Sequence, residues 1–239
     1  MAVSQKQKAR PPIKEIAQSR RERERLQRRE TIINAAKELF YEKGYQTTTM
    51  ADIAAAAELS KGTLYLYFSG KDELYVTIIL EGFKIIDHRL KEISASEMDL
   101  VAKGRSMFMT FVEFCLGNRE YFRVTQYFLS ETARQNLPDE LVDGVSGYTT
   151  SLLGYVADLV SDGIKSGLLR KDVDPRAFAV IAWRTATGLL DLALVNDATG
   201  LAGGEYAELF ERAFDLLIRG AMKTWHGPPH GGGVDESRG

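Results

Sequence analysis

The chain has 239 residues, 44% of them hydrophobic and 27% charged, and its formal net charge is −2 at pH 7. This composition is typical of a globular protein that can bury a core, and it excludes a polycation. The chain has one cysteine, Cys115, so no intrachain disulfide can form. The sequence shows neither a secretory leader nor an apolar run of about 18 residues, and we therefore expect a cytoplasmic protein.

The positive charge is concentrated toward the N-terminus. Residues 1–80 hold 14 Lys and Arg against 10 Asp and Glu, whereas the rest of the chain holds 17 against 23. This asymmetry indicates that the N-terminal part meets a polyanion and that the remainder does not.

The predicted elements are helical along nearly the whole chain, because apolar residues recur at helical spacing and no segment alternates like a strand. We interpret the charged residues 1–27 as a flexible basic arm whose end could be helical. The first core helix ends near Gly44, a glycine suited to a C-cap. Thr49 and Ser60 are candidate N-caps of two short helices, about 50–56 and about 61–68.

A long helix follows over 71–94, and the C-terminal half predicts five more. These lie near residues 99–117, 119–132, 139–167, 175–195 and 204–224. The Gly/Pro-rich stretch 226–239 is typical of a disordered tail. The predicted fold class is therefore all-α.

The two short helices have the residue pattern of a helix-turn-helix. The first carries a small apolar face of Ile53, Ala54 and Ala57, and Leu64 and Phe68 can pack inward from the second. The second helix then presents its outer face to the DNA major groove. Its predicted outward residues are Lys61, Gly62, Thr63, Tyr65 and Tyr67.

A close resemblance to the DNA-binding domain of the tetracycline-repressor (TetR) family is carried by the stretch TTTMADIAAAAELSKGTLYLYFSGKDEL. It covers about residues 28–88, and the later part of the chain is similar to the family only in helical character and length. The matching positions are Thr49, Ile53, Ala54, Ala57, Ser60, Gly62, Tyr65, Tyr67, Phe68, Lys71 and Leu74. One departure is Glu58, where the family often has glycine in the turn.

The resemblance implies roles for seven residues that touch DNA. Those nearest the base edges are Lys61, Gly62 and Thr63. Those placed at phosphates are Thr49, Tyr65, Tyr67 and Lys71, and Thr49 also caps its helix. The arm 1–27 either adds phosphate or minor-groove contacts or serves as a solubilising tail, and its charge alone does not decide between them.

The family resemblance also implies the domain organisation. Residues 28–88 form the DNA-binding domain, with the helix-turn-helix over about 49–70, and residues 89–225 form a helical domain for effector binding and dimerisation. Helices 175–195 and 204–224 are expected to build a homodimer, against the alternative that their faces are buried within one chain.

The resemblance also implies a ligand pocket in the C-terminal domain, and the many aromatic residues there suit an apolar one. The candidate lining residues are Phe108, Phe111, Phe122, Tyr127, Tyr155, Trp183 and Thr187. A polar stripe of Arg184, Thr187 and Asp191 could bind an anionic ligand or form an ion pair, and the ion pair is favoured because Asp191 supplies a partner for Arg184.

The function that the resemblance implies is a ligand-responsive homodimeric repressor. It would bind a pseudo-palindromic double-stranded operator and release it when a small lipophilic effector binds. We expect no enzyme activity, cofactor, metal or membrane association, because the sequence has no P-loop, dinucleotide fingerprint or HExxH motif. An activator and a protein-interaction adaptor remain the alternatives, and a salt titration on DNA would separate the adaptor.

Overall fold

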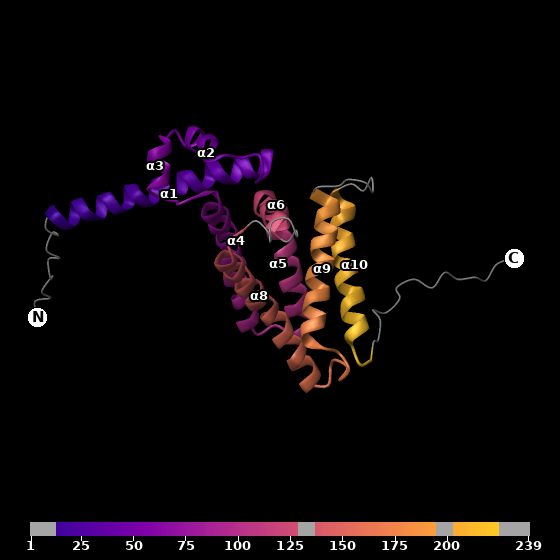
Figure 1. The fold of residues 1–239 in the computed structure, drawn as a ribbon. Helices are drawn as coiled ribbons and strands as arrows, with labels where there is room; N and C mark the ends of the chain where they lie inside the picture. Colours follow the sequence, from indigo (N-terminus) through magenta and orange to yellow (C-terminus); the bar gives the residue numbers. More distant parts are fainter. Residues whose placement is uncertain (1–12, 129–136, 195–202, 225–239) are drawn as a thin grey trace, which may run out of the picture. The chain divides into compact units, whose positions relative to one another are not determined.

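The computed structural model describes residues 13–128, 137–194 and 203–224 as a set of α-helices (Figure 1). The first part contains α1 (Ile13–Lys43), α2 (Met50–Ala56), α3 (Lys61–Tyr65), α4 (Lys71–Ala95), α5 (Leu100–Gly117) and α6 (Arg119–Phe128). The later part contains α8 (Asp139–Lys165), α9 (Pro175–Leu194) and α10 (Gly203–Ala221). The predicted all-α fold is confirmed, and the described residues add one isolated antiparallel bridge between Leu169 and Met222.

Several helix bounds differ from the prediction, and α8 and α10 end at Lys165 and Ala221, two and three residues before their predicted ends. α1 begins at Ile13, so residues 13–27, the end of the predicted arm that the sequence left open as helical, continue the first helix. α3 ends at Tyr65 although the pattern predicted a helix to Phe68, because the amides of Leu66 and Tyr67 already bond three residues back. The arm residues 1–12 and the tail 226–239 lie outside the described residues.

The chain divides into two compact units, and the boundaries fall inside α4, after the first residue of α6 and in the first turn of α8. The first contains residues 1–79 and 120–141, and the second contains residues 80–119 and 142–239. Helix α6 thus belongs to the same unit as α1, α2 and α3. The domain boundaries derived from the sequence stay predictions.

The core of the first unit is built on one face of α1. Ile32 and Ala36 of α1 are completely buried, as are Ile53 of α2 and Leu64 of α3. Phe68 is 1% exposed although it follows α3, so the turn after the helix closes over the same core. Close packing of these side chains holds α2 and α3 at a fixed angle on α1.

In the second unit, α5, α9 and α10 pack together. The rings of Phe108 and Phe214 lie 5.9 Å apart between α5 and α10, and the Arg105 guanidinium donates to the carboxylates of Glu211 and Asp215 on α10. Cys115 is buried on α5, and burial raises the pKa of its thiol to about 12. This thiol is therefore a core group.

Helix α9 leaves much of its apolar surface uncovered. Among the described residues it is the one helix long and apolar enough to cross a membrane by length and composition. Only 28% of its apolar 18-residue stretch is buried, however. Val180 is 43% exposed and Ile181 53% exposed. An apolar face of this kind commonly marks an interaction surface.

Candidate DNA-binding surface

Both short helices of the first unit begin with a side-chain cap, as the sequence predicted. The Thr49 hydroxyl accepts from the Asp52 amide at 3.2 Å, and the Asp52 carboxylate accepts from the Thr49 amide at 2.9 Å. This reciprocal pair is a capping box. Hydrogen bonds from Thr49 lower the pKa of Asp52, the side-chain bond contributing most. Ser60 caps α3 by accepting from the Thr63 amide at 3.1 Å.

The turn between α2 and α3 is built on a left-handed residue. Glu58 has φ +55°, the conformation that favours glycine. Its amide bonds the Ala55 carbonyl at 3.1 Å, and the Leu59 amide bonds the Ala54 carbonyl at 2.8 Å. This is the hydrogen-bond pattern of a Schellman motif, which ends α2 and turns the chain toward α3. It also explains why the family often has glycine at this position.

The outward face of α3 matches the face proposed to read DNA. Lys61 and Gly62 are exposed, and Tyr65 is 45% exposed. Thr63 and Tyr67 are half-buried, and the Thr63 hydroxyl lies 2.8 Å from that of Ser60. Lys61, Gly62, Thr63 and Tyr65 therefore lie on one short helix capped by Ser60, and Tyr67 lies in the turn that follows it.

Leu66 belongs to this surface although the sequence reasoning missed it. It is 78% exposed, directly after α3, between the two tyrosines. On a helical wheel it lies opposite the buried Leu64, so helical periodicity alone could have identified it. An exposed leucine beside the tyrosines can make apolar contacts, such as those proteins form with thymine methyl groups.

Lys71 has a different place from the one implied by the resemblance. Its ammonium donates to the carbonyl of Tyr45 at 2.7 Å and to that of Thr48 at 2.9 Å, and it lies 4.2 Å from the centre of the Tyr45 ring. Burial lowers the pKa of this lysine, while Asp72 raises it. Lys71 therefore ties the start of α4 to the loop between α1 and α2.

Helix α6 is attached to the same unit by an aromatic cluster. The Tyr127 ring lies 5.3 Å from that of Tyr45 and 5.8 Å from that of Tyr75. The Tyr75 hydroxyl donates to the Val124 carbonyl, and the Gln46 amide donates to the Tyr127 hydroxyl at 2.6 Å. Burial is the main cause of the raised pKa values of Tyr45 and Tyr75, so both phenols stay neutral.

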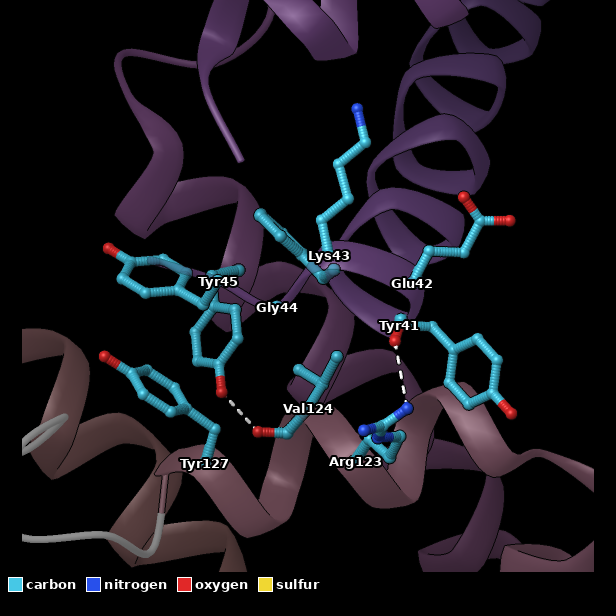
Figure 2. Close-up of a pocket in the computed structure, with 10 residues that line it drawn as sticks. Tyr41, Glu42, Lys43, Gly44, Tyr45, Arg123, Val124 and Tyr127 are labelled. Atoms are coloured by element: carbon cyan, nitrogen blue, oxygen red, sulfur yellow. Dashed lines mark hydrogen bonds between the residues drawn. The ribbon is translucent and has the colours of Figure 1, made fainter. Parts of the chain in front are cut away.

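The cluster borders a cavity of 260 Å³ between the end of α1 and α6 (Figure 2). On one side Arg123 donates to the Tyr41 carbonyl at 3.2 Å, near the C-terminal end of α1. Figure 2 shows Tyr127 and Tyr45 on the other side. The lining residues are Phe40, Tyr41, Glu42, Lys43, Gly44, Tyr45, Tyr75, Arg123, Val124 and Tyr127.

The residues predicted for the effector pocket are divided between the two units. Phe122 and Tyr127 lie on α6 in the first unit, and of the seven predicted residues Tyr127 alone lines the cavity of Figure 2. The other five lie on α5, α8 and α9 of the second unit: Phe108, Phe111, Tyr155, Trp183 and Thr187. The seven residues therefore do not form one site within either unit.

Two polar groups of this predicted set already have partners within the second unit. The Tyr155 hydroxyl donates to the Asp87 carboxylate at 3.1 Å. The pKa of this tyrosine is raised, mainly by burial and secondly by the neighbouring Asp87 carboxylate. The buried Thr187 hydroxyl donates to the Arg184 carbonyl at 3.2 Å. Arg184 itself is exposed, with its guanidinium 5.6 Å from the centre of the Trp183 ring.

Comparison with known proteins agrees with this geometry. A family described as "Bacterial regulatory proteins, tetR family" matches residues 32–78, which include α2, α3 and the first turns of α4. The "Fatty acid metabolism regulator protein" of Bacillus subtilis (strain 168) is 25% identical over 189 residues, 79% of this chain and 93% of that protein. The "HTH-type transcriptional repressor KstR2" of Rhodococcus jostii (strain RHA1) is 28% identical over 148 residues, 62% of this chain and 70% of that protein.

A solved structure shows the same fold. The transcriptional regulator FadR from Bacillus subtilis, crystallised in complex with stearoyl-CoA, superimposes with a TM-score of 0.67 at 22% identity, over 80% of this chain and 97% of that one. These relatives are transcriptional regulators rather than enzymes. The capped helix-turn-helix, the family match over residues 32–78 and the relatives together support a DNA-binding transcriptional regulator of the TetR family.

Proposed function

We propose that the chain is a homodimeric, ligand-responsive repressor that reads its operator with α3. The observation that carries the proposal is the two-sided burial of α3. Its outer face is exposed, whereas its inner side is completely buried. Lys61, Gly62 and Thr63 are assigned to base edges, and Tyr65 and Tyr67 to phosphates. Leu66 is added as an apolar contact.

A second copy of the chain is the partner that best fits α9. Its outward face is formed by residues that are all exposed: Ala177, Val180, Ile181, Arg184 and Gly188. Apart from Arg184, these side chains are small or apolar, and their spacing allows another helix to approach closely. A two-fold dimer would set two α3 helices about 34 Å apart, which suits a pseudo-palindromic operator in the bacterial cytoplasm.

The effector that we propose is a lipophilic acyl compound bound by the second unit. Support comes from the relatives whose names refer to fatty acid metabolism and from the FadR structure with stearoyl-CoA. The aromatic residues predicted for the pocket on α5, α8 and α9 are the candidates for this site. The effector must bind the DNA-free conformer more tightly than the DNA-bound one, because otherwise the equilibrium does not shift.

The proposal is tested on a duplex that the full-length protein selects from random DNA. We expect Lys61→Ala to weaken binding to this duplex by about tenfold, which corresponds to one lost base contact. The matched control is Lys84→Ala, which removes another exposed lysine, from α4. Equal affinities of the two variants would contradict the role of α3.

The effector is tested in the same assay with stearoyl-CoA, using coenzyme A alone as the control. Release by stearoyl-CoA and not by coenzyme A supports a lipophilic effector. If the protein binds its duplex and stearoyl-CoA changes nothing at concentrations where it binds the protein, the repressor release mechanism is wrong while DNA binding stands.

A further inference from the structure

The N-terminal half of α1 carries a dense group of exposed arginines. Residues 20–29 contain six arginines and two glutamates, and residues 20–28 are all exposed. In Figure 1 this half of α1 runs on beyond α2 and α3. The segment is helical, so its side chains are sorted onto faces with the period of an α-helix.

The arginines continue the face of α1 that packs on the helix-turn-helix. Arg21, Arg25 and Arg28 precede the fully buried Ile32 at spacings of four, three and four residues, and we call these three residues the arginine row. Arg29 confirms the direction of this face, because its guanidinium lies 5.1 Å from the centre of the Phe68 ring. The face is therefore apolar where α2 and α3 cover it and basic beyond them.

The two glutamates of this segment flank the row, one on each side. Glu24 lies three residues after Arg21 and four before Arg28, and its carboxylate pairs with the Arg20 guanidinium at 2.9 Å, so its charge is offset by an arginine outside the row. Glu22 borders the row and reduces its charge. Three arginines against one glutamate leave this face positive, in the same unit as the DNA-reading helix.

We propose that the arginine row binds backbone phosphates of the DNA that flanks the half-site read by α3. The row extends over about 10 Å at the helical rise of 1.5 Å per residue. Each DNA strand carries a phosphate about every 3.4 Å, so the row can meet at least two of them. Such contacts lengthen the footprint and add affinity without reading sequence. This inference rests on the proposed DNA-binding function.

The test compares two double variants of the full-length protein. Arg21→Gln with Arg25→Gln removes two charges from the row, and Arg20→Gln with Arg23→Gln removes two charges from other faces of the same segment. Because the net charge is equal, long-range attraction changes equally. Glutamine is a good helix former, and circular dichroism checks that both variants keep the helix content of the parent.

Affinity is measured over a series of KCl concentrations on the selected duplex with long flanks and on the same duplex trimmed to the half-sites. For the row variant on the long duplex we expect a shallower salt dependence. The magnitude of the slope of log association constant against log salt concentration should fall by about 0.9 for each lost contact, which is about 2 for the two arginines of one protomer. The dissociation constant should rise about tenfold or more at low salt. The control variant should change much less, and on the trimmed duplex the two variants should agree.

Equal slopes for both variants on the long duplex would overturn the proposal while leaving DNA binding by α3 intact. A loss that persists on the trimmed duplex would place the row inside the half-site and would also overturn it. If the row variant loses binding to phosphatidylserine vesicles and keeps its DNA affinity, the row is a membrane contact. Failure of the parent protein to bind any duplex in a salt-dependent way would instead refute the proposed function.

Discussion

Glu58 shows how one residue can depart from its family and still form the same turn. The left-handed backbone at φ +55° is required by the Schellman hydrogen bonds that end α2, whatever residue stands there. For a residue with a Cβ this conformation costs roughly 1 kcal/mol. The resemblance indicated that glutamate must adapt to the turn, and the structure shows that the side chain stays exposed while the backbone adopts the strained conformation.

We expect Glu58→Gly to stabilise the protein by about 0.5–1 kcal/mol, because glycine adopts positive φ without strain. The measurement is the free energy of unfolding in urea. Glu58→Gln is the control, since it removes the same charge and keeps the Cβ. Stabilisation of equal size in both variants would show that charge, and not backbone strain, is the cause.

Lys71 is the other residue whose role depends on its neighbours. The resemblance implies a phosphate contact, whereas in the structure its ammonium donates to the carbonyls of Tyr45 and Thr48. A positive charge that is held by carbonyl oxygens stabilises the loop before α2 and so positions α3 indirectly.

We expect Lys71→Met to lower the free energy of unfolding by about 1 kcal/mol, because two carbonyls lose a charged donor. The salt dependence of DNA binding should stay unchanged. A fall of the salt slope by about 0.9 per protomer would instead show a direct phosphate contact. Lys61→Ala, measured in parallel, provides the comparison for a lysine on the reading face.

At the scale of elements, α2 and α3 depend on their ends more than on their length. They contain seven and five residues, far fewer than an isolated helix needs for stability. Capping by Thr49 and Ser60 satisfies amides that the helices leave unpaired. Burial of Ile53 and Leu64 against α1 supplies the remaining stabilisation.

We expect Thr49→Val to destabilise the protein by about 1 kcal/mol at pH 7, because it removes the hydroxyl that caps α2. The same change should raise the pKa of Asp52, since the Thr49 side chain is the main cause of its lowering. Carboxyl NMR titration measures this pKa directly, and an unchanged value would contradict the capping box.

The pH dependence follows from the direction of that shift. A carboxyl whose folded pKa lies below its unfolded value of about 4 stabilises the fold fully above that value. The contribution is lost as the pH falls through the folded pKa. The stability difference between the parent and Thr49→Val should therefore narrow in acid, and urea titrations at neutral and acidic pH test this.

At the scale of the whole molecule, the uncovered face of α9 determines the assembly that we propose. Only 28% of the apolar stretch of α9 is buried, so a monomer would expose Val180 and Ile181 to water. Covering that face with a second copy removes the apolar surface and pairs the two DNA-reading units.

We expect Ile181→Glu to convert the dimer into a monomer, because a carboxylate placed in an apolar interface has no partner. Light scattering coupled to gel filtration should then give a mass near the 26.7 kDa of one chain. Ile85→Glu is the matched control, since Ile85 is 40% exposed on α4, and it should leave the dimer intact. A dimer that survives Ile181→Glu would exclude α9 as the interface.

The sequence by itself determined the all-α class, the helix-turn-helix and its two caps. These features depend on periodicity and on hydrogen bonds over three or four residues, which a local pattern records. The contact that ties Tyr75 to Val124 spans 49 positions, and the bond from Lys71 to Tyr45 spans 26. No local pattern encodes such pairs, so only the tertiary structure decided that α6 belongs with the DNA-reading unit and that Lys71 binds a loop. It also decided how far α1 extends, and packing of Arg29 on Phe68 then showed which face the arginine row presents.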